Sequence, residues 1–132
     1  ADAAKAMALG ADACYIGTAS LIALNCNKPI YEEDYRAIGA APYACHHCHT
    51  GRCPVGITTQ DPELMKRLDV EQGAERVRNL LHAMTLEIQM IARSCGKSDV
   101  HHLEPEDMAA LTGEASVICG IPLAGTRKVF GK

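Results

Sequence analysis

The segment from Cys45 to Cys53 constrains this 132-residue chain more than any other part, because it holds three cysteines and three histidines within nine residues. Cys45 and Cys48 are separated by two residues, and Cys53 stands directly before Pro54. Thiolates at such spacings can converge on one metal ion or cluster. Cys26, further upstream, could complete a set of four. The segment therefore predicts a metal or cluster site.

The neighbouring histidines decide which kind of site is expected. Iron–sulfur clusters bind thiolates almost exclusively, whereas structural zinc accepts cysteine and histidine together. His46, His47 and His49 are therefore candidate zinc ligands, or hydrogen-bond donors to the sulfur atoms of a cluster. The spacing favours a cluster and leaves open zinc, a redox-active cysteine pair and plain buried thiols. The other cysteines stand in apolar surroundings and are expected to be buried: Cys14, Cys95 and Cys119.

Composition and charge exclude several classes of function. The net charge is −3 with acidic and basic residues interspersed, so no footprint for nucleic acid or an anionic membrane is present. No apolar run is long enough to span a bilayer, and no basic stretch followed by an apolar one opens the chain. The odd number of cysteines, seven, argues against a disulfide framework. We expect a cytoplasmic protein.

The first 25 residues have the pattern of an alternating α/β fold. An alanine-rich helix over residues 1–9 is expected to close at Gly10, followed by a buried strand at Ala13–Ile16. Gly17 and Thr18 then precede a short helix that continues to Leu24. A glycine at this point lets a phosphate approach backbone N–H groups, although a turn glycine with a capping threonine explains the same residues.

Residues 26–60 predict an irregular excursion, in which the tyrosines are expected to pack, followed by the cysteine segment. Asp61 and Pro62 predict the start of a helix that ends near Leu68. Asp69 should cap a longer helix through a capping box with Gln72. An apolar stripe in steps of three and four runs along this helix, which Gly96 closes: Val70, Ala74, Val77, Leu81, Met84, Ile88, Ile91 and Cys95.

The last part of the chain is expected to contain one more helix, Glu106 to Cys119, and then an extended tail. The sequence thus divides into three parts. Residues 1–25 form a βα unit with a phosphate loop, residues 26–60 hold the insertion and the cysteines, and residues 61–132 form a helical region with a tail. The residues present are mainly helical, with about one strand and long loops.

Two stretches resemble a known family. GADACYIGTASLIALNC (residues 10–26) and CHHCHTGRCPVGITTQDPEL (residues 45–64) are similar to the FMN-binding synthase domain of glutamate synthases, whose cysteine motif ends in CPVGI-x-TQDP. The insertion between Cys26 and Cys45 and the stretch HHLEPEDMAALTGEASVICGIPLAGT resemble the glutamate-synthase-like subunits of N-methylglutamate synthases. The resemblance covers nearly the whole chain.

The resemblance implies the C-terminal end of a (β/α)8 barrel that carries FMN and an iron–sulfur cluster. By this likeness Ala13–Ile16 is the last barrel strand, and Gly17 and Thr18 help bind the FMN phosphate. Cys48 and Cys53 match the family's cluster ligands, and Cys26 or Cys45 supplies the rest. Three ligands would suit a [3Fe–4S] cluster and four a [4Fe–4S] cluster. No catalytic residue is identified.

The implied activity is that of an oxidoreductase of glutamate biosynthesis. Electrons would pass through the cluster to FMN. The reduced flavin would then drive the reductive amination of 2-oxoglutarate, which gives glutamate with ammonia or N-methylglutamate with methylamine. A complete barrel needs about 250 residues, so this chain alone is expected to be inactive. Its expected partners are the rest of the FMN barrel and glutaminase-like or other synthase subunits. Isolated, it should self-associate, because a lone barrel strand leaves backbone groups unpaired.

Two alternatives remain open at the level of the sequence. The first is a self-standing iron–sulfur electron carrier that assembles with a separate barrel subunit. The second is a zinc-stabilised interaction module, which the crowding of cysteine and histidine allows.

Overall fold

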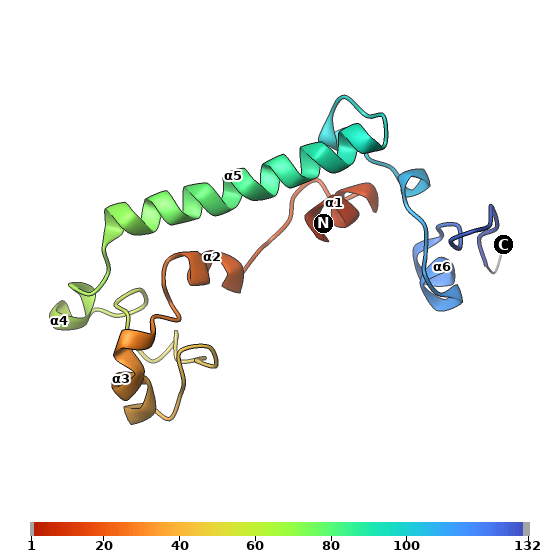
Figure 1. Ribbon diagram of the computed structural model, residues 1–132. Coiled ribbons are helices and arrows are strands. Elements are labelled where there is room, and N and C mark those ends of the chain that lie inside the picture. The colour runs from red at the N-terminus through yellow and green to blue at the C-terminus, as the bar shows by residue number, and fades with distance from the viewer. Residues whose placement is uncertain (1, 131–132) are drawn as a thin grey trace. The chain divides into compact units, whose positions relative to one another are not determined.

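The computed structural model describes residues 2–130, which form helices joined by long loops (Figure 1). The α-helices are α1 (Asp2–Ala8), α2 (Thr18–Ala23), α3 (Glu32–Ala37), α4 (Pro62–Met65), α5 (Val70–Ser94) and α6 (Gly113–Cys119). Short 3-10 helices are η1 (Pro29–Tyr31), η2 (Val100–His102) and η3 (Pro105–Asp107). The described chain divides into two compact units. We call residues 16–81 the cysteine unit, and residues 2–15 with 82–130 the terminal unit.

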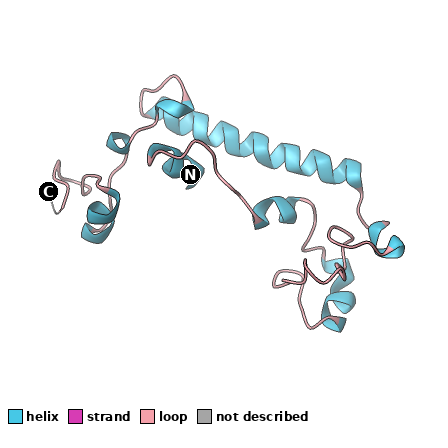
Figure 2. Cartoon of the chain, turned by 180° about the vertical axis from the view of Figure 1, so that it is seen from behind, coloured by secondary structure: helices cyan, strands magenta, loops and turns pink. Residues whose placement is uncertain are grey.

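The expected strand at Ala13–Ile16 is not formed, and no strand occurs within residues 2–130 (Figure 2). Residues 13–15 are exposed, and the side chain of Tyr15 is fully in solvent. A strand requires a neighbour to pair its backbone groups, and this segment has none in the described chain. The predominance of helix is confirmed, whereas the prediction of one buried strand is wrong for the structure of this chain.

The terminal unit has a small core in which α1 lies against the C-terminal half of α5 (Figure 1). Ala4 and Ala8 of α1 and Ala92 of α5 are buried with Leu103. Half-buried apolar residues surround them: Ile88, Ile91, Cys95, Val100 and Met108. Small side chains one helical turn apart allow this close approach. The predicted helix end is confirmed, since α1 stops at Ala8 and Gly10 has a φ of +100°; the first residue of the predicted range lies outside the described residues.

Helix α5 begins and ends where its sequence signals predict. The carboxylate of Asp69 accepts a hydrogen bond from the N–H of Gln72 at 3.0 Å, and Gly96 is left-handed with a φ of +75°. Of the predicted apolar stripe, Val70 and Leu81 are exposed, while Ile88 and Ile91 contribute to the terminal core. None of the helices within residues 2–130 is long and apolar enough to cross a membrane.

The predicted helix Glu106–Cys119 is too long. Residues 105–107 form η3, and α6 begins only at Gly113, because the hydroxyl of Thr112 caps it by accepting from the N–H of Ala115 at 3.1 Å. The prediction of an extended tail is wrong for residues 121–130, and residues 131–132 of that tail lie outside the described residues. Ala110 pairs with Leu123 in an isolated parallel bridge, so the chain after α6 turns back. Ser116, fully buried, donates to the carbonyl of Ile121 at 2.7 Å and accepts from the N–H of Phe130 at 3.0 Å.

Replacing Ser116 with alanine is expected to lower the free energy of unfolding by about 1–3 kcal/mol. The carbonyl of Ile121 and the N–H of Phe130 would both lose the hydroxyl that they share as a hydrogen-bond partner. Urea denaturation would measure the change. The matched control is Ser94→Ala, whose hydroxyl also bonds a carbonyl, that of Ile91, but is exposed to water. Equal effects of the two substitutions would contradict the assigned role of Ser116.

Candidate metal centre

All four predicted ligands lie in the cysteine unit. Cys26 follows the end of α2, and Cys45, Cys48 and Cys53 stand in the loop between α3 and α4. All four are free thiols, with Cys48 exposed and the others half-buried. Of the cysteines expected to be buried, Cys14 and Cys119 are instead exposed and Cys95 is half-buried. The apolar residues next to Cys14 and Cys119 in the sequence do not cover these two thiols. The segment around Cys14 is exposed and forms no strand, and on α6 the neighbours Val117 and Ile118 are themselves exposed.

Cys26 lies within electrostatic range of the other three cysteines. Burial raises the pKa of the Cys26 thiol, and the charges of Cys48, Cys45 and Cys53 raise it further. Such mutual repulsion between thiolates requires proximity. The sulfur atoms that the sequence singled out, from positions 26 to 53, are therefore gathered in one unit of the fold.

Cys53 has an environment that favours its thiolate. Its burial acts to raise the pKa, but the backbone N–H groups of Thr58, Ile57 and Val55, together with the Thr58 hydroxyl, outweigh this and lower the pKa of the thiol. The Thr58 hydroxyl oxygen is buried and makes no hydrogen bond of normal geometry to any residue of the described chain. The residues that follow Cys53 thus provide the groups that favour its thiolate.

Gly56 makes this tight loop possible. Its φ is +81°, and a Cβ atom there would overlap the carbonyl oxygen of Leu64 and lie 3.1 Å from its carbonyl carbon. Only glycine lets the loop after Cys53 lie against the end of α4. Asp61 anchors the same region, since its carboxylate caps α4 by accepting from the N–H groups of Glu63 at 2.8 Å and Leu64 at 3.1 Å. The predicted start of this helix is confirmed, although α4 ends at Met65 rather than near Leu68.

Tyr35 is a buried aromatic residue of the cysteine unit. It is 1% exposed, and its hydroxyl donates to the carbonyl of Cys26. Burial raises the pKa of this phenol, and the charges of Cys26, Cys45 and Cys53 add to the effect. The sequence predicted packing for this tyrosine, which is correct for the ring, but gave no sign that its hydroxyl meets the backbone of a candidate ligand.

Arg67 connects the insertion to the Cys-Pro step. Its guanidinium donates to the carboxylate of Asp34 at 3.0 Å and to the carbonyl of Pro54 at 2.8 Å, and it lies over the ring of Tyr31, 4.5 Å from the centroid. The side chain is only 27% exposed, so these bonds are partly shielded from water. Sequence reasoning did not identify Arg67, since no spacing rule links positions 33 residues apart.

Arg67→Ala is expected to lower the free energy of unfolding of the cysteine unit by about 2 kcal/mol, because a half-buried charged donor is removed from two acceptors and one ring. Urea denaturation followed by circular dichroism would measure it. The control is Arg36→Ala, which removes an exposed ion pair with Glu32 and should change stability by less than about 0.5 kcal/mol. A similar small loss for both variants would contradict the bridging role of Arg67.

The histidines do not complete a zinc shell. The rings of His46 and His47 stack on each other, 5.3 Å between centroids. Within residues 2–130, no three histidine, cysteine, aspartate or glutamate side chains converge closely enough to hold one metal ion.

Gly17 and Thr18 stand at the start of α2. Gly17 is the N-cap residue with a φ of +46°, no side chain caps the helix there, and a Cβ atom on it would meet nothing within 4 Å. The hydroxyl of Ser20 donates to the carbonyl of Gly17 at 2.7 Å. The expected capping role of Thr18 is therefore not seen, because Thr18 is already the first residue of the helix.

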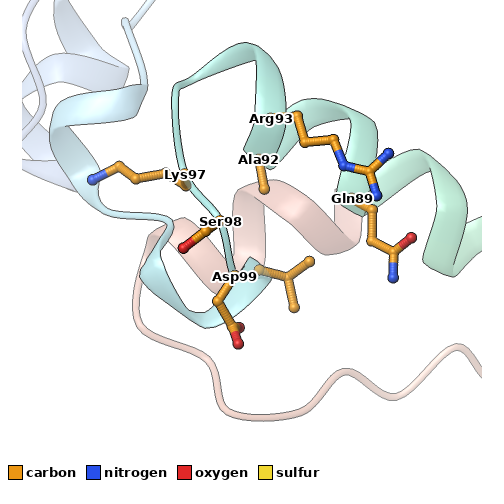
Figure 3. Close-up of a pocket in the computed structure, with 7 residues that line it drawn as sticks. Gln89, Ala92, Arg93, Lys97, Ser98 and Asp99 are labelled. Atoms are coloured by element: carbon orange, nitrogen blue, oxygen red, sulfur yellow. The ribbon is translucent and has the colours of Figure 1, made fainter.

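A separate cavity of about 180 Å³ lies in the terminal unit and contains none of the predicted site residues. Its lining includes Gln89, Arg93 and Asp99 (Figure 3). Lys97 also lines it, and the amine of this residue forms ion pairs with Glu104 at 2.6 Å and Asp107 at 3.6 Å. These two carboxylates, first Glu104 through its hydrogen bond, raise the pKa of Lys97.

Comparison with known proteins agrees with the resemblance. A family model described as the conserved region in glutamate synthase matches residues 1–98. The chain is 55% identical over 132 residues, all of this chain and 30% of the relative, to the glutamate synthase large subunit-like protein of Rhizobium meliloti. It is 46% identical over 103 residues, 78% of this chain and 17% of the relative, to the archaeal glutamate synthase (NADPH) of Methanocaldococcus jannaschii.

A similar relation holds for the archaeal-type glutamate synthase (NADPH) of Thermotoga maritima, with 41% identity over 123 residues, 93% of this chain and 20% of the relative. The chain thus spans less than a third of the length of each of these relatives. No solved structure matches it significantly. The expected membership of an enzyme family is confirmed by these names: the chain belongs to the glutamate synthase family.

Proposed function

We propose that this chain supplies the iron–sulfur-binding part of an FMN-dependent, glutamate-synthase-like oxidoreductase. The observation that carries the proposal is the gathering of four free thiols, Cys26, Cys45, Cys48 and Cys53, in one compact unit of a glutamate synthase family member. The complete enzyme would aminate 2-oxoglutarate reductively to glutamate or N-methylglutamate in the cytoplasm. The finer likeness to N-methylglutamate synthases rests on the insertion and the C-terminal stretch alone.

The residues present fit a cluster better than a single ion. A structural zinc ion needs four ligands around one centre, and no three candidate side chains within residues 2–130 meet that condition. In a cluster each thiolate binds a different iron, so the thiolates stand further apart. The buried Thr58 hydroxyl without a regular partner and the N–H groups directed at Cys53 are the donors that sulfur atoms of a cluster accept. Four thiols favour [4Fe–4S] over [3Fe–4S].

Bound there, the cluster would supply one-electron transfer. The chain's own residues would hold it: the four cysteines as ligands, and Thr58 with its neighbouring N–H groups as donors that stabilise negative charge on sulfur. The same unit holds buried residues that would limit the access of water: Tyr35, Val55 and Thr59. Such desolvation and hydrogen bonding are the means by which a protein sets a cluster's potential.

Gly17 and Thr18 would contribute to the FMN phosphate site. The uncapped start of α2 and the open space beside Gly17 support this assignment. A helix of six residues offers few N–H groups, so most of the flavin site would come from the rest of the barrel. The same partner would pair the exposed segment Ala13–Ile16 as a strand. Further synthase subunits are expected to complete the enzyme.

A chimera tests this function directly. The matched segment of the Methanocaldococcus jannaschii enzyme would be replaced by the corresponding part of this chain, which is 46% identical to it. NADPH-dependent glutamate formation should persist in the chimera and disappear when Cys53→Ser is added. An unmodified enzyme serves as the reference. A folded chimera that keeps full activity without Cys53 would contradict the proposed role of the cysteines.

A further inference from the structure

Both backbone polar groups of Cys26, its N–H and its carbonyl, are hydrogen-bonded. Its N–H donates to the carbonyl of Leu21 at 3.0 Å, which closes the end of α2. Its carbonyl accepts from the hydroxyl of Tyr35 on α3. These two backbone bonds fix the direction in which the Cα–Cβ bond of the half-buried Cys26 points.

The residue before Cys26 is fixed as well. Asn25 has a φ of +68°, a left-handed conformation that asparagine tolerates, and this turns the chain after α2. The Asn25 side-chain oxygen accepts from the guanidinium of Arg76 on α5. The turn that directs Cys26 towards the other cysteines is thus bonded from α3 on one side and α5 on the other.

A tyrosine at position 35 would destabilise the fold if its buried hydroxyl made no hydrogen bond. It is 1% exposed, the most buried large side chain of the described cysteine unit. A buried phenol without an acceptor would cost free energy that phenylalanine would avoid. Its acceptor is the backbone of Cys26, a candidate ligand whose membership of the ligand set the sequence left open.

We propose that Tyr35 is a positioning residue that holds Cys26 in place as the fourth thiolate ligand of the cluster. The inference deepens the proposed function and rests on it. The insertion between Cys26 and Cys45 then has a specific purpose: α3, which it contains, brings the phenol to the backbone of the first ligand.

The substitution Tyr35→Phe isolates the hydroxyl, because it keeps the ring that packs in the core. Its matched control is Tyr43→Phe, in the same insertion, where the side chain is 89% exposed. The 132-residue chain, reconstituted anaerobically with iron and sulfide, would be measured for iron per chain, for the electron paramagnetic resonance signal of a three-iron cluster, and for the rate of iron loss to a chelator. We expect Tyr35→Phe to lose iron about tenfold faster and to accumulate the three-iron signal, and Tyr43→Phe to match the unmodified chain.

A double-mutant cycle separates positioning from general stability. If Tyr35 acts through Cys26, then Tyr35→Phe should have no further effect in a Cys26→Ser background. An equally large effect in that background, or an unmodified rate of iron loss in Tyr35→Phe alone, would overturn the inference while leaving the cluster itself in place. An unmodified chain that binds zinc and no sulfide would instead contradict the proposed function and the ligand role with it.

Alkylation of the iron-free chain gives an independent readout. Cys26 should react with iodoacetamide faster in Tyr35→Phe than in Tyr43→Phe, since its backbone loses one of its two bonds. Peptide mass spectrometry would report the rate at each cysteine. Identical rates at Cys26 in the two variants would count against positioning by the phenol.

Discussion

Alanine at position 56 is expected to destabilise the cysteine unit by more than about 3 kcal/mol, because a left-handed backbone and a collision with a carbonyl are combined at one residue. Gly56 has a φ of +81°, and the added Cβ atom would overlap the carbonyl oxygen of Leu64. That oxygen belongs to backbone, which cannot swing aside as a flexible side chain can. The loop after Cys53 would have to move away from α4, and the donors around the Cys53 sulfur would move with it.

Gly51→Ala is the control for this prediction. Gly51 lies in the same segment with a φ of +71°, but a Cβ atom on it would meet nothing within 4 Å. It should therefore cost only the conformational penalty, about 1–2 kcal/mol. Urea denaturation of both variants would compare the two losses. A Gly56→Ala variant no less stable than Gly51→Ala would show that the close approach to Leu64 is not needed.

Serine in place of Cys53 is expected to remove nearly all bound iron, because the thiolate with the most hydrogen-bond donors is lost and an alcohol does not ionise at neutral pH. The measurement is iron and acid-labile sulfide per chain after anaerobic reconstitution, together with the visible absorption. The chain offers a control in Cys119→Ser, since Cys119 is an exposed thiol on α6 of the terminal unit. Retention of a full complement of iron by Cys53→Ser, or an equal loss in Cys119→Ser, would contradict the assignment.

Local signals explain what could be predicted from the sequence. Asp61 and Asp69 cap α4 and α5, and Gly10 and Gly96 close α1 and α5, because these rules act over three or four neighbouring residues. The cysteine motif predicts a ligand set from its spacing, and this set stays a prediction, although the structure places those thiols in one compact unit. The predicted helix starts and ends are confirmed because they depend on short-range chemistry.

Long-range contacts explain what could not be predicted. The bond from Tyr35 to Cys26 spans nine residues, and that from Arg67 to Asp34 spans 33, so no helical or strand period indicates either. The strand at Ala13–Ile16 was expected from composition, but a strand exists only with a partner to bond it. The helix predicted over Glu106–Cys119 did not take Thr112 into account as an N-cap residue. Because Thr112 caps the helix, α6 begins only at Gly113.

The most direct test of the account is an analysis of iron, acid-labile sulfide and zinc in the anaerobically purified chain, with a visible absorption spectrum. A four-thiolate cluster site predicts a brown protein with about four irons and four sulfides per chain and little zinc. A colourless protein with one zinc per chain and no sulfide would contradict it, and would make Cys26, Cys45, Cys48 and Cys53 parts of a structural zinc site instead.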